Sequence, residues 1–212
     1  MKYSLGILFL FLFFTSCKND DSNPTIPIQT QDAVTDYFPL EVGNYWIYQH
    51  YRADSTLVFI NQNITDSVYV EKDTVVSGNT YKVLRSSFLN DVFLIRDSAD
   101  CLVLPNGQKI FSLNQSNELL AKVYYPENDT SYVLVWKMNP TDSVCNVPSG
   151  QYSARYVNGI LNSTDPNNPA YRQRNLFYAY SKNIGWVSRR LCFLGAEVYL
   201  EERLLRFHLN TK

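Results

Sequence analysis

The sequence predicts an all-β fold, an antiparallel up-and-down meander that forms a barrel, a half-barrel or a two-layer sheet with few or no helices. Aromatic residues make up 15% of the chain and include 16 Tyr, and Tyr favours strands. From Tyr45 onward, segments with period-two alternation follow one another. Short turns separate them, and such connections join antiparallel neighbours because parallel pairing needs crossovers of a dozen or more residues.

The alternation gives a series of expected strands between turns. Ser77-Gly78-Asn79 and Asn106-Gly107 supply the positive φ of tight hairpins. Only residues 115–122 could form a helical turn or two, and they fit a loop equally well. The expected strands span residues 45–51, 56–61, 68–76, 80–88, 92–97, 102–104, 109–113, 119–125, 132–137, 152–157, 171–181, 186–194 and 198–209.

Two segments are long enough to be surface loops. Residues 139–150 carry Pro140 and Pro148, and residues 159–170 carry the stretch Asp-Pro-Asn-Asn-Pro. Loops on a rigid β scaffold often hold binding residues, so these segments are candidates for a site, with inert connectors as the alternative.

The first residues have the composition of a secretory signal. Lys2 precedes an apolar run over residues 5–14, which is too short to span a bilayer because that takes about 20 residues. Phe14-Thr15-Ser16-Cys17 resembles the lipobox of bacterial lipoproteins, and this resemblance implies a lipid on Cys17. An ordinary signal peptide is the alternative. We therefore expect a signal peptide at residues 1–16, a lipidated flexible tether at 17–36 and a single β domain at 37–212.

The residues behind Cys17 bear on location. Lys18-Asn19-Asp20-Asp21 resembles the surface-export signal of Bacteroidota-type lipoproteins, while a solvated start to the tether explains it equally well. We expect a lipid-anchored protein of the outer membrane, on either the periplasmic or the surface-exposed leaflet, with the membrane as a partner through its lipid.

The start of the β domain carries a second resemblance. Residues 38–48 read FPLEVGNYWIY, which resembles the opening FPLxVGNxWxY of uncharacterised β-rich lipoproteins of the Bacteroidota type. Gly185-Trp186-Val187 and residues 197–205 resemble the closing hairpin of the same group. The resemblance implies a β-rich lipoprotein and carries no enzymatic activity.

The charge balance limits the partners of this chain, and its cysteines limit its disulfide bonds and metal sites. The 19 basic and 20 acidic residues become 18 and 20 when Lys2 leaves with the signal, which makes nucleic acid a poor partner. Cys101, Cys145 and Cys192 allow at most one intramolecular disulfide, with the pairing open. No spacing typical of a metal site is present, so we predict no metal and no cofactor beyond the lipid of Cys17.

The sequence offers little catalytic chemistry. Common nucleophile, metalloprotease and phosphate-binding motifs are absent, and His50 and His208 lie in expected strands. Glu197, Glu201 and Glu202 could serve a glycan-acting hydrolase by residue type. However, adjacent strand residues point to opposite faces, and the nearby Arg203 and Arg206 suggest ion pairs. We predict no catalytic residues and no enzyme.

Aromatic strands are the most suggestive feature. Both faces of residues 45–48 are apolar, and residues 176–180 repeat the pattern. Such faces are covered by a second layer or bind a ligand. Our leading hypothesis is a non-enzymatic, membrane-anchored module that binds an apolar ligand, a glycan or an envelope protein. A structural envelope protein with a filled core, and lastly a hydrolase, are the alternatives. The candidate ligand-facing aromatics are Tyr45, Trp46, Tyr48, Tyr178 and Tyr180.

Overall fold

A computed structural model describes residues 32–88, 92–114, 117–125, 132–163, 173–193 and 198–210. The expected signal peptide, the lipidation site Cys17 and most of the expected tether lie outside the described residues, and so does Glu197. The compact unit begins at Asp32.

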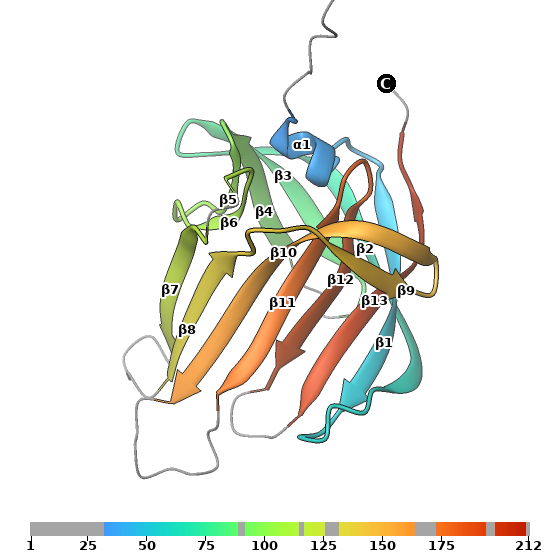
Figure 1. Ribbon diagram of the computed structural model, residues 1–212. Helices are drawn as coiled ribbons and strands as arrows, with labels where there is room; N and C mark the ends of the chain where they lie inside the picture. The colour runs from blue at the N-terminus through green and yellow to red at the C-terminus, as the bar shows by residue number, and fades with distance from the viewer. Residues whose placement is uncertain are drawn as a thin grey trace, which may run out of the picture. The chain divides into compact units, whose positions relative to one another are not determined.

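The described residues form one antiparallel 13-stranded sheet (Figure 1). The strand order is β6-β5-β4-β3-β2-β1-β13-β12-β11-β10-β8-β7, and β9 pairs with β10 off this path. The strands are β1 (Tyr45–Ala53), β2 (Ile60–Val76), β3 (Asn79–Ser86), β4 (Val92–Ser98), β5 (Cys101–Val103), β6 (Lys109–Ser112), β7 (Leu119–Tyr125), β8 (Tyr132–Met138), β9 (Ser143–Val147), β10 (Gly150–Ser163), β11 (Arg174–Ser181), β12 (Gly185–Cys192) and β13 (Tyr199–His208).

The sheet curls until its two outermost strands approach each other, which gives a nearly closed barrel. Glu118, just before β7, joins these edges. Its carboxylate accepts hydrogen bonds from Lys109 Nζ at 2.5 Å and Ser112 Oγ at 2.6 Å, both on β6. The predicted fold class, an all-β antiparallel meander, is confirmed, and of the three expected shapes the barrel is the one that forms.

Three expected segments differ in detail, one of them the expected loop at residues 159–170, whose residues 159–163 belong to strand β10. The expected loop at residues 139–150 contains strand β9, because the two prolines flank the strand and leave its ladder with β10 intact. Residues 56–59 are not part of a strand, because the chain turns at residues 54–57, where the Asp54 carboxylate accepts the Thr56 N–H at 2.9 Å and Leu57 has a φ of 58°. The expected strands 56–61 and 68–76 therefore become the single strand β2.

A short helix, α1 (Val34–Tyr37), lies ahead of the expected domain start at Tyr37. It sits at the upper end of the barrel in Figure 1. Val34 and Tyr37 are buried in the main core, the Asp36 carbonyl accepts the Asn183 N–H at 2.5 Å, and Asp32 accepts a hydrogen bond from Lys182. The chain is thus attached to the barrel from Asp32 onward.

Aromatic side chains fill this upper end, and we call Val34, Tyr37 and Phe38 the plug. The ring of Phe38, which has no exposed surface, lies 5.1 Å from the Trp46 ring and 4.8 Å from the Trp186 ring. Phe111 packs at 5.3 Å from Tyr37. Gly185 makes room for the plug, because a Cβ there would lie 2.8 Å from Phe38.

No helix within the described ranges is long and apolar enough to cross a membrane.

Candidate functional site

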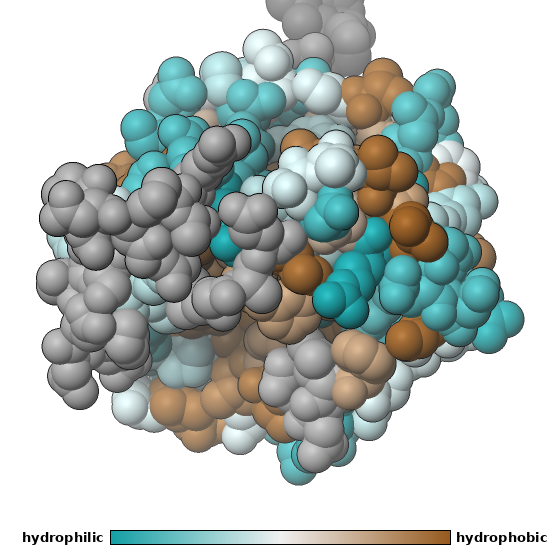
Figure 2. Space-filling view, turned by 90° about the horizontal axis from the view of Figure 1, so that it is seen from below, coloured by the Kyte–Doolittle hydropathy of each residue, from teal (hydrophilic) through white to brown (hydrophobic). Residues whose placement is uncertain are grey.

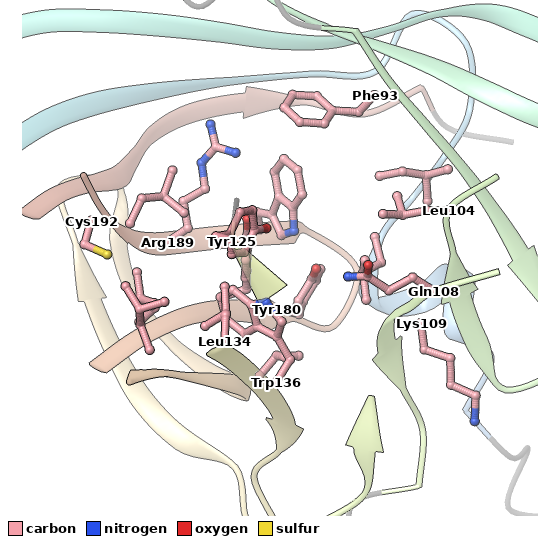
Figure 3. A pocket seen from close by; sticks show the side chains of 18 residues that line it. Phe93, Leu104, Gln108, Lys109, Tyr125, Leu134, Trp136, Tyr180, Arg189 and Cys192 are labelled. Carbon is pink, nitrogen blue, oxygen red and sulfur yellow. The ribbon is translucent and has the colours of Figure 1, made fainter. Parts of the chain in front are cut away.

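A cavity of about 430 Å³ opens inside the barrel below the plug (Figure 3). Aliphatic and aromatic side chains dominate its wall, with Gln108, Lys109 and Arg189 as the charged or amide groups. The lining residues are Phe93, Ile95, Leu104, Gln108, Lys109, Ile110, Tyr125, Leu134, Trp136, Val157, Leu161, Leu176, Tyr178, Tyr180, Trp186, Arg189, Leu191 and Cys192.

Strands β8, β10, β11 and β12 build most of the wall. Period-two alternation turns every second side chain inward, and the register places Gly159 of β10 between Trp136 and Leu176. A Cβ on Gly159 would lie 2.5 Å from the Trp136 ring. Gly159 therefore lets the indole lie flat against β10, where it packs 5.3 Å from the Tyr178 ring.

Tyr180 and Trp186 close the upper end of the cavity, because both line it and both also pack in the aromatic core. Burial raises the pKa of Tyr178 and of Tyr180, so both phenols are neutral at ordinary pH. The wall therefore offers hydroxyl groups without adding charge.

The five predicted ligand-facing aromatics separate into three environments. Tyr178 and Tyr180 line the cavity. Trp46 and Tyr48 are buried in the core, where the indole Nε1 donates to the Ile184 carbonyl at 2.5 Å and the Tyr48 hydroxyl donates to the Trp186 carbonyl at 3.1 Å. Tyr45 is exposed and stacks on the His208 ring at 5.4 Å. The structure thus brings two of the five to the cavity.

A second cavity, of about 420 Å³, has an apolar wall that includes Ile64, Phe88, Phe193 and Leu200 together with His50. Phe193 follows the end of β12 and Leu200 lies near the start of β13, and these two strand ends are at the bottom of Figure 1. Seen from below, apolar side chains are exposed among polar ones at this end (Figure 2). Ile64, Phe88 and Phe193 are exposed by 41%, 46% and 53%. The lower end is therefore apolar as well as hollow.

A buried charged cluster lies between the two cavities, since Arg189 lines the first and His50 the second. Arg189 donates to both carboxylate oxygens of Glu202, with Nε at 2.6 Å and Nη2 at 2.9 Å. His50 Nε2 lies 3.6 Å from Glu202 Oε1. Asp66 completes the cluster, and all four side chains are buried.

Asp66 is held by the end of β3 and the turn after it. Its carboxylate accepts hydrogen bonds from Ser86 Oγ at 2.7 Å, Ser87 Oγ at 3.0 Å and the Phe88 N–H at 2.8 Å. Burial lowers the pKa of His50 although Glu202 and Asp66 oppose the shift. Burial also acts against the charge of Arg189, but Glu202 outweighs it and raises the arginine pKa. One donor atom from each of His50, Asp66 and Glu202 lies within 4.8 Å of the others.

The two described candidate glutamates of a hydrolase do not converge. Glu202 binds Arg189, whereas Glu201 accepts hydrogen bonds from Arg190 Nε at 2.9 Å and from Arg203 Nε at 2.7 Å. Arg203 therefore pairs with Glu201 as predicted, and the other two arginine partners, Arg189 and Arg190, come from β12.

The three cysteines of the described domain are free thiols. Cys101 and Cys145 are buried, and Cys192, which is partly exposed, lines the main cavity.

Sequence reasoning missed the aliphatic wall of the cavity and the charged cluster. Leu134, Leu161 and Leu176 form a small core cluster of their own. Their inward position follows from the alternation of each strand, and this alternation is the sequence pattern that could have identified them. Which inward residues enclose space depends on how the sheet curls, and that is not a local property.

No protein-family model matches the sequence, and no curated protein sequence matches it. Solved structures do resemble the fold. A Bacteroides fragilis protein assigned as exported, of YmcC-like fold, is 12% identical with a TM-score of 0.50 over 82% of this chain and 99% of that one. A protein assigned as a lipoprotein from Parabacteroides distasonis is 12% identical with a TM-score of 0.46, over 84% of this chain and 100% of its own. The hypothetical lipoprotein YmcC from Escherichia coli is 10% identical with a TM-score of 0.35, over 76% and 84%. The first of these shows a shared fold.

Proposed function

We propose that this chain is a lipid-anchored protein of the bacterial outer membrane whose barrel holds an apolar molecule. The observation that carries the proposal is the cavity of about 430 Å³ with its largely aliphatic wall. Pockets for small ligands commonly measure about 300–1,000 Å³ and combine apolar walls with a few polar groups. The hydrophobic leader and Cys17 support export and anchoring.

The chemistry of the wall favours an apolar ligand over a glycan. A sugar needs many hydrogen bonds, because its hydroxyl groups lose their water on binding. The aliphatic side chains of the wall cannot supply them, and the Arg189 guanidinium is already bound to Glu202 through two hydrogen bonds. The polar groups that remain, chiefly Gln108, Lys109 and the tyrosine hydroxyls, are few beside this apolar surface. An aliphatic group such as an acyl chain suits these walls.

Cavity filling tests the binding proposal. The full chain, purified in detergent and exchanged into lipid nanodiscs, is titrated with a fluorescent fatty acid, with empty nanodiscs as the blank. We expect saturable binding by the wild type and at least a tenfold loss in Leu176→Trp, which places an indole in the cavity. Leu205→Trp, at an exposed position on β13, is the matched control and should bind like the wild type.

An unaffected Leu176→Trp variant with native circular dichroism would place the dye elsewhere and overturn the proposal. Absence of saturable binding by the wild type would do the same and favour the structural alternative. The anchor is tested separately by labelling cells with a clickable palmitate. We expect label on the wild type and none on Cys17→Ala.

A further inference from the structure

The buried charged cluster follows from strand pairing. His50 of β1 faces Glu202 of β13, and Glu202 faces Arg189 of β12. On the other side of β1, Tyr48 pairs with Asp66 of β2. A row of polar side chains from four adjacent strands therefore meets on the inner face of the barrel.

The cluster carries one more negative charge than positive charge. Two carboxylates, Asp66 and Glu202, face one guanidinium, that of Arg189, when His50 is neutral. These side chains have 0%, 1% and 3% of their surface exposed, so solvent cannot screen the excess negative charge well. A bound cation would balance it.

His50 supplies a second, independent observation. Its Nε2 atom is buried and has no hydrogen-bond partner, although buried ring nitrogens are normally satisfied. The atom points to the carboxylates of Glu202, at 3.6 Å, and Asp66. The nitrogen is therefore free to bind a ligand from the cluster side.

The geometry points to a binding site for a divalent transition-metal ion of the zinc class, with His50 Nε2 and one carboxylate oxygen each from Asp66 and Glu202 as ligands. Donors around tetrahedral zinc lie roughly 3.4 Å apart, given bonds of about 2.0–2.2 Å. The His50–Glu202 spacing of 3.6 Å already fits. All three donor atoms lie within 4.8 Å of one another, so no spacing has to close by more than about 1.4 Å.

The surroundings of these donors resemble the outer shell of metal sites, in which ligating carboxylates are themselves hydrogen-bonded. Ser86, Ser87 and the Phe88 N–H hold Asp66, and Arg189 holds Glu202. An imidazole nitrogen among the donors favours zinc, copper, iron or nickel over magnesium and calcium, which prefer oxygen ligands. The second cavity, which His50 lines, offers a route to the site.

A chain with only two histidines allows a direct test. In His208→Gln, a change at an exposed position, His50 is the one remaining histidine. The full-length variant, purified in detergent and labelled with ¹⁵N-histidine, is titrated with ZnSO₄ at pH 7.5. We expect one equivalent of zinc to shift the Nε2 resonance of His50. A spectrum that zinc leaves unchanged overturns the proposal, and an imidazolium pattern would then identify a proton as the balancing charge.

Affinity gives the second measurement. Zinc titrations by calorimetry compare the wild type with His50→Gln and His208→Gln, which share all thiols. We expect His50→Gln, which removes a direct ligand, to weaken the site by more than the roughly 10–100-fold that loss of an outer-shell partner costs, and His208→Gln to leave it unchanged. Equal binding by all three proteins would assign the zinc to another site and contradict the proposal. The result is independent of whether the main cavity takes an apolar ligand.

Discussion

The two ends of the barrel are filled in different ways. At the upper end, Phe38 lies between Trp46 and Trp186 with no exposed surface. At the lower end, the same sheet encloses the main cavity, and Phe88 and Phe193 remain exposed. Dense packing stabilises a fold, whereas an empty cavity forgoes dispersion contacts along its wall. We conclude that the plugged end supplies much of the stability that allows the other end to stay hollow.

Removal of the central ring of the plug should have the largest effect. Phe38→Ala leaves a void among packed aromatic rings, and we expect the free energy of unfolding to fall by about 3–5 kcal/mol. Urea denaturation followed by Trp fluorescence measures it. Phe207→Ala, at a position 38% exposed on β13, is the control and should cost less than about 1 kcal/mol. Equal losses would mean that the ring of Phe38 stabilises the fold no more than an exposed ring does.

The same substitution at each end sharpens the comparison. Leu204 is fully buried in the main core, and Leu176 borders the cavity. Because Leu176 already lacks neighbours on one side, Leu176→Ala should cost about 2 kcal/mol and Leu204→Ala about 4 kcal/mol. Denaturation curves of the two variants provide the test. A larger loss for Leu176 would mean that the lower end is packed as densely as the upper one.

Alkaline pH should loosen the plug. Burial, together with the hydrogen bond that Tyr37 donates to Asp32 at 3.0 Å, raises the pKa of Tyr37 to about 12. Its unfolded pKa is about 10, so the folded state favours the neutral phenol. The resulting stabilisation is present below pH 10 and disappears as the pH rises from 10 to about 12.

Tyr37→Phe isolates this effect, because the other tyrosines are shared with the wild type. We expect the wild type to be more stable by about 1 kcal/mol at pH 8, which is the typical contribution of one hydrogen bond. The difference should shrink between pH 10 and 12 in urea denaturation. A constant difference across that range would show that Tyr37 does not titrate with unfolding.

The strands could be predicted from the sequence because period-two alternation is a local property. Helix α1 could not, since four residues are too few to form a helix alone and depend on contacts of Val34 and Tyr37 with the barrel. Strand β9 was not predicted because Pro140 and Pro148 indicated a loop, but both prolines lie outside the residues of β9 that pair with β10.

The site was harder to predict than the fold. Tyr178 and Tyr180 were identified as candidates from their type, but the row of His50, Glu202 and Arg189 depends on register across three strands. The register of β1 with β13 shifts between Ile47 and Tyr48, and the register of β1 with β2, which carries Asp66, shifts between Gln49 and Tyr51. A shift of one residue exchanges the inner and outer faces of a strand, so no local pattern could place these side chains together.

Thiol labelling of the wild type should give the smallest effect, and it probes the main cavity without a substitution. Cys192 lines the cavity and is partly exposed, whereas Cys101 and Cys145 are only 8% and 6% exposed. Burial raises the pKa of Cys192 although Arg174 opposes the shift, so its reaction with a maleimide should be slow but still several-fold faster than theirs. Peptide mapping by mass spectrometry measures the three rates. A saturating apolar ligand should slow Cys192 alone, and equal protection of all three thiols would indicate general tightening of the barrel in place of occupancy of the cavity.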